Sequence, residues 1–261
     1  MHPMLNVAVK AARAAGRVIL RHVDRIDTLT IRSKDRNDFV SEVDQLAEQE
    51  IIRIISRAYP DHGFLAEESG ARGEDEYQWV IDPLDGTTNF LHGFPQFAVS
   101  IALKHRGRLD QGLVYDPMKE ELFTASRGAG AQLNNRRLRV TQPNGLEGAL
   151  LGTGIPFRSH QDVDRYLDTM RVLLPGTAGV RRAGSAALDL AYVAAGRLDG
   201  FWEFALHEWD MAAGVLLILE AGGLVAEPDG GSNYLRSGDI VAGSAKVVKA
   251  MTAAMHPVLK A

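Results

Sequence analysis

The chain contains no cysteine, no long apolar run and no marked excess of charge of either sign. Without cysteine, a disulfide framework, a thiolate nucleophile and a zinc–thiolate site are all excluded. No apolar run approaches the roughly 18 to 20 residues that a membrane-spanning helix needs, and residues 1–5 lack the charged-then-apolar order of a signal peptide. We therefore expect a cytoplasmic protein with no membrane partner.

The balance of charge also limits the partners. A formal net charge of −4 supplies no basic field that would hold nucleic acid by itself. Internal repeats and low-complexity tracts are absent as well. The 261 residues, of which 46% are hydrophobic, are enough to fill the core of one large domain or two smaller ones. This composition is typical of an ordinary globular enzyme.

The first part of the chain alternates helix and strand patterns. Apolar residues recur at helical spacing over residues 3–23, which predicts an amphipathic helix. Thr28 to Arg32 alternates like a strand, and Lys34 to Asp38 is polar enough to be a loop. Ser41 to Asp44 fits a capping box, which predicts the start of a second helix that ends before Pro60.

Strand patterns dominate the middle of the chain. A short apolar strand over residues 63–66 is followed by another over residues 78–81. Three further runs separated by turn sequences predict an antiparallel meander: residues 97–103, 109–115 and 122–125.

The best candidate for a linker is Gln142 to Gly145. It divides the chain into residues 1–145 and 146–261, which we expect to form one compact catalytic unit. Helices and strands alternate beyond it, as in a layered α/β unit. The predicted strands are 149–152, 201–203, 224–226 and 240–242, and the predicted helices are 161–174, 184–195, 210–221 and 245–259.

The stretch Asp82-Pro83-Leu84-Asp85-Gly86-Thr87-Thr88-Asn89 follows a buried strand. Pro83 has no N–H to donate and is expected to end the ladder, so both aspartates would lie on the turn that leaves the strand. Gly86 lets the backbone approach a ligand closely, and a helix opening at Thr87 would turn its first N–H groups to the same point. This pattern favours a cation beside a phosphate, although an Asp-rich turn with a helix cap would read the same way.

Three other acids follow the same pattern, each with a structural alternative. Glu67 ends the strand before Asp82 and could meet it across neighbouring strand ends, or be a solvated loop acid. Asp44 could serve as the capping partner of its helix alone. Asp210 opens a nearly apolar helix, where a first-turn acid is also favoured by the helix dipole.

Together these residues resemble the inositol monophosphatase family. The resemblance rests on three separated stretches in the family's order: Glu67-Glu68-Ser69, Asp82 to Asn89, and Trp209-Asp210-Met211-Ala212-Ala213-Gly214. A further stretch, Arg181 to Ala191, is similar to a bacterial branch of that family. The resemblance implies an α+β fold, a layered α-β-α-β-α sandwich of the sugar-phosphatase type. It also implies Mg²⁺ dependence, hydrolysis of small phosphate monoesters, sensitivity to lithium and a homodimer.

The resemblance implies two or three Mg²⁺ ions per subunit. The first would be held by Glu67, Asp82, the main-chain carbonyl of Leu84 and Asp85, and the second by Asp82, Asp85 and Asp210. These are the hard oxygen ligands that Mg²⁺ prefers, and paired ions can activate a water and stabilise a leaving alkoxide. Lys34 matches a loop lysine near a possible third-metal region. The one departure in these motifs is Ser41, where many relatives carry threonine, and a helix cap accepts either residue.

Catalytic and substrate roles follow by position. Thr87, with Asp44 as its partner, would orient the attacking water near Glu67, and the amides of Gly86 and Thr87 would bind phosphate. Arg181 would touch substrate or lie at the dimer face. The substrate-binding set that the resemblance implies is Leu84, Asp85, Gly86, Thr87, Arg181, Gly184, Ser185, Ala186, Glu203 and Asp210, of which Gly184 to Ala186, Glu203 and Asp210 face the polyol. An exposed strand-end acid is the alternative for Glu203.

The predicted activity is hydrolysis of inositol 1-phosphate to inositol and phosphate. Relatives that this chain resembles act instead on histidinol phosphate, fructose bisphosphate or a nucleotide 3′-phosphate, so the substrate is open. The bacterial branch is also associated with transcription antitermination complexes beside Nus factors. The Arg181-Arg182 pair could then contact protein or RNA in a complex with RNA polymerase, and such a role does not exclude catalysis.

Overall fold

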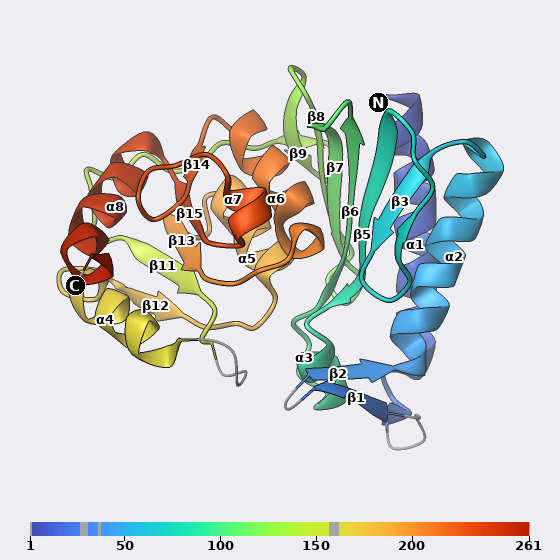
Figure 1. Cartoon of the computed structure of the whole chain (residues 1–261), viewed down its shortest axis with the longest axis horizontal. Helices are drawn as coiled ribbons and strands as arrows, with labels where there is room; N and C mark the ends of the chain where they lie inside the picture. The colour runs from blue at the N-terminus through green and yellow to red at the C-terminus, as the bar shows by residue number, and fades with distance from the viewer. Residues whose placement is uncertain (1, 27–30, 36–37, 157–161, 261) are drawn as a thin grey trace.

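The chain folds into five layers, in the order α-β-α-β-α, in a computed structural model (Figure 1). The structure describes residues 2–26, 31–35, 38–156 and 162–260, with the backbone alone for 31–35 and 38–40. The α+β layered fold expected from the sequence is confirmed. Every strand of the larger sheet precedes residue 145, and every strand of the smaller sheet follows residue 146.

The larger sheet has eight strands in the order β10-β9-β8-β7-β6-β5-β3-β4. Neighbours are antiparallel except β3 and β5, which run parallel. The predicted meander corresponds to β6, β7 and β8. The strands are β3 (Gly63–Ala66), β4 (Gly70–Arg72), β5 (Tyr77–Asp85), β6 (Ala98–His105), β7 (Arg108–Asp116), β8 (Glu121–Ser126), β9 (Gly130–Leu133) and β10 (Arg136–Arg137).

The smaller sheet has five strands in the order β12-β11-β13-β15-β14. β11 runs parallel to both of its neighbours, and β15 runs antiparallel to both of its own. The strands are β11 (Leu150–Thr153), β12 (Gly179–Arg181), β13 (Gly200–Glu203), β14 (Leu224–Ala226) and β15 (Ile240–Gly243). A separate antiparallel pair, β1 (Ile31–Asp35) and β2 (Asp38–Ser41), lies beside the short helix α3 (Thr87–Leu91).

Helices fill the three remaining layers. α1 (Pro3–His22) and α2 (Glu42–Ala58) cover the outer face of the larger sheet, and α4 (Val163–Leu173) and α8 (Ala245–Leu259) cover the outer face of the smaller one (Figure 1). α5 (Ala186–Ala194) and α6 (Glu208–Glu220) lie between the sheets. α7 (Tyr234–Ser237) is a short helix of about one turn. In the region that the structure describes, no helix is both long and apolar enough to cross a membrane.

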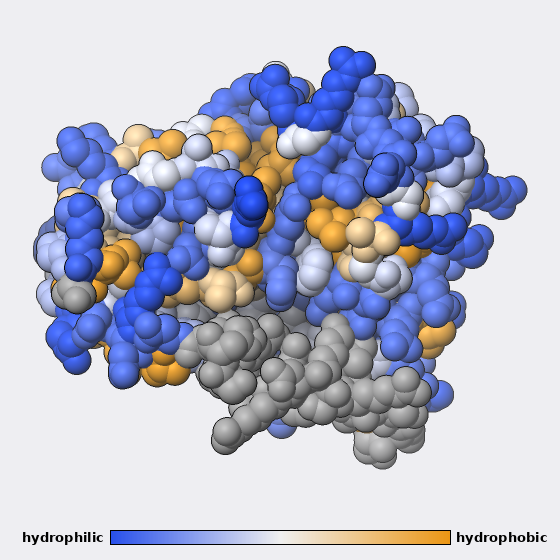
Figure 2. All heavy atoms as spheres, viewed as in Figure 1, coloured by the Kyte–Doolittle hydropathy of each residue, from blue (hydrophilic) through white to orange (hydrophobic). Residues whose placement is uncertain are grey.

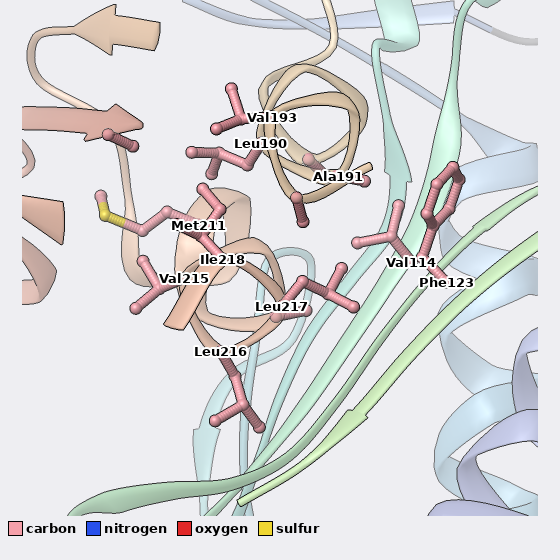
Figure 3. Close-up of a cluster of buried hydrophobic side chains, with 14 of the residues drawn as sticks. Val114, Phe123, Leu190, Ala191, Val193, Met211, Val215, Leu216, Leu217 and Ile218 are labelled. Atoms are coloured by element: carbon pink, nitrogen blue, oxygen red, sulfur yellow. The ribbon is translucent and has the colours of Figure 1, made fainter. Parts of the chain in front are cut away.

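The layers are held by three apolar clusters, one at each end and one in the middle. Figure 3 shows the middle cluster, where Val114 and Phe123 of the larger sheet face side chains of α5 and α6. These two helices pack closely, since a Cβ built on Gly214 would lie 2.5 Å from the Cβ of Leu190. The apolar sequence of both helices, which reads as buried on every side, is explained by their position between two sheets. Hydrophilic residues, in contrast, cover most of the face seen in Figure 2.

Some elements differ from the sequence-based expectations. β5 does not end at Pro83 but continues to Asp85, with a register shift against β6 between Asp82 and Asp85. A shift of this kind leaves the proline out of the ladder, so the strand tolerates it. Lys34, expected in a loop, lies in β1. Leu46 of α2 is 43% exposed because Val43, Ala47, Ile51 and Ile55 form the buried face of that helix.

Candidate active site

A cavity of about 160 Å³ opens where elements of both sheets converge. It lies at the ends of β3 and β5, the starts of α3, α5 and α6, and the ends of β11 and β13. The predicted site residues that line it are Glu67, Asp82, Leu84, Asp85, Gly86, Thr87, Gly184, Ser185, Ala186, Glu203 and Asp210. The three stretches that are far apart in the sequence therefore meet at one cavity.

The parallel pairing of β3 and β5 brings the first two acids together. Ala66 pairs with Ile81, so Glu67 and Asp82 follow neighbouring strand ends. The amide of Glu67 donates to the carbonyl of Ile81 at 3.1 Å, and the amide of Glu68 donates to the Glu48 carboxylate of α2 at 2.8 Å. These bonds hold the loop that carries Glu67 against the site.

Three aspartates form a tight group at the cavity. Asp82, Asp85 and Asp210 each offer a carboxylate oxygen, and these oxygens lie within 4.8 Å of one another. Burial raises the pKa of Asp82 well above its ordinary value, and the charges of Glu67, Asp85 and Asp210 raise it further. Burial also raises the pKa of Asp85 to about 6, although hydrogen bonds from α5 oppose that rise. Like charges held this closely indicate a site built for cations.

The turn after Asp82 is shaped by local bonds. The Leu84 amide donates to Oδ1 of Asp82 at 2.9 Å, and Gly86 then takes φ = 94° before α3 begins. A side chain at Gly86 would be strained by this left-handed φ, and its Cβ would lie 2.9 Å from the Gln96 carbonyl oxygen. Both the φ and the close approach to the Gln96 carbonyl require glycine at this position.

Asp210 and Asp44 each combine a helix-capping bond with a place at the site. Oδ2 of Asp210 accepts from the His207 amide at 2.7 Å, and Asp44 completes the predicted capping box with Ser41. Asp44 is fully buried behind the cavity wall, and its Oδ1 accepts from the Thr87 hydroxyl at 2.8 Å. Burial raises the pKa of Asp44, and the hydrogen bonds from Ser41 and Thr87 oppose this. Both acids therefore make the bonds of the structural alternative, and their places at the cavity leave the functional one as a prediction.

The start of α5 joins the two halves of the site. The Ser185 hydroxyl and the Ala187 amide, the latter at 2.8 Å, both donate to Oδ2 of Asp85. Asn89 of α3 donates to the carbonyls of Gln96 at 2.7 Å and Ala183 at 2.9 Å. Asp85 is thus held by donors on one oxygen, which leaves its other oxygen for a ligand.

Glu203 contributes a further acid to the cavity wall. It ends β13, it is only partly exposed, and a Cβ built on Gly154 would lie 1.8 Å from its Oε1 atom. Its carboxylate therefore occupies the space that the missing side chain of Gly154 leaves. Burial raises the pKa of Glu203 well above its ordinary value, and the charges of Asp189, Asp210 and Asp85 add to this.

Arg181 is a predicted substrate residue that does not line the cavity. Arg181 is exposed on β12, where its guanidinium donates to the Val180 carbonyl at 3.3 Å, and its neighbour Arg182 lines the cavity instead. Arg181 is the last residue of β12, and Arg182 lies in the segment that follows the strand and leads to the cavity. The structure describes only the backbone of Lys34. Its predicted place near a third metal ion therefore stays a prediction.

Several residues that line the cavity were missed from sequence. They are Thr88, Asn89, Thr153, Gly154, Ile155, Arg182, Asp189, Ala205 and Leu206. Asp189 shares the sequence pattern of Asp210, because each is an acid in the first turn of an apolar helix. That pattern could have identified Asp189 as a site residue. The glycine and the apolar residues carried no signal, because only the packing of β11 against β13 places them here.

The donor set fits a divalent cation. Three clustered carboxylates, a fourth acid at Glu67 and main-chain carbonyls are the hard oxygen ligands that Mg²⁺ takes. Thiolate ligands, which would favour zinc, are absent because the chain has no cysteine. The site also leaves room beside these acids for a small ester.

The chain is similar to known proteins over nearly its whole length. The profile of the inositol monophosphatase family matches residues 1–258. A protein from Pseudomonas aeruginosa called Nus factor SuhB is 56% identical over 263 residues, which cover 98% of this chain and 97% of that protein. The crystal structure of the extragenic suppressor protein SuhB from Bartonella henselae superposes with a TM-score of 0.94 at 46% identity and covers 97% of this chain and 98% of its own. The inositol monophosphatase of Anabaena superposes with a TM-score of 0.84 at 38% identity, covering 97% of this chain and 95% of its own.

Proposed function

Because this chain belongs to the inositol monophosphatase family, we propose that it is a Mg²⁺-dependent hydrolase that converts inositol 1-phosphate to inositol and phosphate. The observation that carries the proposal is the group of three aspartate oxygens within 4.8 Å, set beside the Thr87–Asp44 hydrogen bond in one cavity. The cavity takes residues from both parts of the chain, so residues 1–145 and 146–261 act as one catalytic unit.

Two or three Mg²⁺ ions would be held mainly by the clustered acids. Glu67, Asp82, the carbonyl of Leu84 and Asp85 would hold one, and Asp82, Asp85 and Asp210 a second. When bound, such ions supply positive charge to the phosphoryl and leaving oxygens and lower the pKa of water. The chain's own part is to keep the carboxylates in place, and Ser185 and Ala187 do this for Asp85.

Thr87 and Asp44 position the attacking water. The Thr87 hydroxyl donates a hydrogen bond to Asp44, so the lone pairs of its oxygen are free to accept from a water in the cavity. Asp44 is itself held by the amide and hydroxyl of Ser41, at 2.8 and 2.5 Å. A water held this way has a lone pair directed to the phosphorus, which is the orientation that an in-line displacement needs.

The phosphate and the alcohol would bind to different walls. The first N–H groups of α3, at Gly86 and Thr87, have no intrahelical partner and line the cavity. Phosphate oxygens would accept from them. The alcohol would lie toward Gly184, Ser185, Ala186 and Glu203, with Asp210 contacting both metal and hydroxyl. Glu203 would select for a polyol by accepting from its hydroxyls.

A phosphate-release screen tests the proposal. The purified protein is assayed with inositol 1-phosphate, histidinol phosphate, fructose 1,6-bisphosphate and a nucleotide 3′-phosphate, in Mg²⁺ and after chelation with EDTA. We expect the highest kcat/KM with inositol 1-phosphate and no turnover in EDTA. Faster turnover of another ester would keep the chemistry and change the substrate, whereas turnover in EDTA would contradict the metal role.

A second role is favoured by the relatives. The protein of Pseudomonas aeruginosa that is 56% identical is called a Nus factor. We therefore propose that this chain also joins a cytoplasmic complex with Nus factors and RNA polymerase, for which the exposed Arg181 is a contact candidate. A pull-down with Asp85→Asn separates the roles, since that variant should lose turnover and still bind. Analytical ultracentrifugation of the same sample tests the expected homodimer.

A further inference from the structure

One acid of the cavity wall has no part in this mechanism. Asp189 stands in the first turn of α5 and lines the cavity, although only 2% of the residue is exposed. Its Oδ1 atom is buried and has no hydrogen-bond partner among the residues that the structure describes. Buried polar atoms without a partner are rare in folded proteins, so this oxygen requires an explanation.

The charges near Asp189 place it among the site residues. Burial and the charge of Asp85 raise the pKa of Asp189 well above its ordinary value, while Arg182 lowers it. The charge of Asp189 in turn raises the pKa of Glu203. Asp189 is therefore close enough to Asp85 and to Glu203 for its charge to interact with both carboxylates.

A purely structural role does not account for this position. An acid in the first turn is favoured by the helix dipole, but that benefit does not require burial. The cap of α5 is already provided by Ser185, whose hydroxyl accepts from the Leu188 amide. An acid that served only the helix would turn its oxygens to water, whereas Asp189 belongs to the cavity wall and its Oδ1 atom is buried there without a donor.

The charge and hydrogen-bonding properties of the groups near Oδ1 of Asp189 limit which chemical group could be its partner. A hydroxyl both donates and accepts, so it pairs with a carboxyl group whether that group is ionised or protonated. When they are ionised, Asp189 and Glu203 would repel a second phosphate. A neutral group that carries hydroxyls is therefore the ligand that fits.

We propose that Oδ1 of Asp189 hydrogen-bonds a hydroxyl of the substrate's alcohol portion, and that Asp189 and Glu203 together make this protein selective for monophosphate esters of polyols. This inference rests on the proposed phosphatase function. It adds Asp189 of α5 as a second specificity residue beside Glu203 of β13. The two acids come from different elements, so they would read different hydroxyls of the same ring.

The first test compares two esters in the Mg²⁺-loaded protein. In Asp189→Ala, the ratio of kcat/KM for inositol 1-phosphate to kcat/KM for p-nitrophenyl phosphate should fall at least about tenfold, because the second ester has no polyol. Asp189→Leu, which fills the volume and cannot hydrogen-bond, should show the same fall if the alanine variant does not fold. Asp189→Asn should recover part of the ratio, since its amide still pairs with a hydroxyl.

A matched control is Asp199→Ala in the same half of the chain. Asp199 accepts from the Thr141 hydroxyl at 2.6 Å and the Leu150 amide at 2.7 Å, so its loss should lower the melting temperature and leave the substrate ratio within about twofold. The Asp189 variants should show the opposite pattern. A lowered melting temperature with an unchanged ratio in those variants would overturn the inference.

A set of deoxyinositol 1-phosphates identifies the hydroxyl. For one analogue, wild type should lose about tenfold in kcat/KM, and Asp189→Ala should lose nothing further. If every analogue loses the same factor in both proteins, Asp189 reads no hydroxyl. Turnover of p-nitrophenyl phosphate without any preference for the polyol ester would overturn this inference while the phosphatase chemistry stands. Turnover of neither ester would overturn the proposed function, and this inference with it.

Discussion

The Thr87 hydroxyl lies 2.8 Å from Oδ1 of Asp44, and this bond joins the start of α3 to the first turn of α2. The other oxygen of Asp44 accepts from both the amide and the hydroxyl of Ser41. One buried carboxylate therefore caps a helix and also fixes the direction of a hydroxyl at the cavity. Any change at either residue should affect how a water is held.

Thr87→Val should lower kcat by about a hundredfold or more, because the replacement keeps the branched shape and removes the oxygen that accepts from water. Thr87→Ser, which keeps the hydroxyl, is the matched control and should lose less than about tenfold. Steady-state kinetics with inositol 1-phosphate in saturating Mg²⁺ measure both. Equal losses in the two variants would assign the effect to packing and not to the hydroxyl.

Asp85→Asn should abolish hydrolysis while the fold remains. Ser185 and Ala187 both donate to Oδ2, so the asparagine oxygen should take that place and its NH₂ group should face the metal position. An amide nitrogen cannot ligate Mg²⁺, and the loss should exceed about a hundredfold. Turnover near that of wild type, with an unchanged circular dichroism spectrum, would remove Asp85 from the metal site.

Mg²⁺ should raise the melting temperature, and the increase should be larger at about pH 8 than at about pH 5.5. The folded-state pKa values of Asp82 and Asp85 are raised, the latter to about 6 from 3.8. Without metal, these acids contribute stability that is present below their unfolded pKa and is lost as the pH rises through the folded one. Bound Mg²⁺ requires the ionised form and relieves the repulsion between the acids, so its benefit grows with pH.

Differential scanning fluorimetry across a Mg²⁺ titration at both pH values measures this dependence. An Asp82→Asn variant serves as the control, because it should show a smaller metal effect and a weaker pH dependence. A melting temperature that does not change over the Mg²⁺ range that supports activity would contradict a preformed acidic cluster.

Glu203→Gln should lower kcat/KM for inositol 1-phosphate much more than for p-nitrophenyl phosphate. Losing an acceptor aimed at a substrate hydroxyl costs on the order of 1 to 3 kcal/mol, or about 5- to 150-fold. Parallel assays with the two esters give the comparison. If both values fall by the same factor, Glu203 supports the metals or the fold, and its role in polyol recognition should be dropped.

Gly154→Ala should reproduce part of that effect from a neighbouring strand. The new Cβ would lie 1.8 Å from Oε1 of Glu203, so the carboxylate must move. We expect a lower preference for inositol 1-phosphate over p-nitrophenyl phosphate, with the sign seen for Glu203→Gln. In the Gly154→Ala, Glu203→Gln double variant the two effects should not add, since they act through one side chain. Full additivity would show that Gly154 acts elsewhere.

Local rules were enough to predict most elements of this chain. The capping box at Ser41, the glycine before α3 and the apolar helices of the middle layer each follow from a few adjacent residues, because caps, turns and amphipathic faces are local. Pro83 shows the limit of such rules. It removes one donor, as expected, yet a register shift against β6 lets β5 continue to Asp85.

The sequence by itself determined which residues carry the chemistry, since acids at strand ends and helix starts are visible in the order of the residues. Only the tertiary structure decided which of them meet. The parallel pairing of β3 with β5 joins Glu67 to Asp82, and the packing of α5 between the sheets brings Ser185 to Asp85, one hundred positions away. It also turned Arg182 rather than Arg181 to the cavity and left an oxygen of Asp189 there without a partner. Such contacts depend on how distant elements pack, which no local pattern encodes.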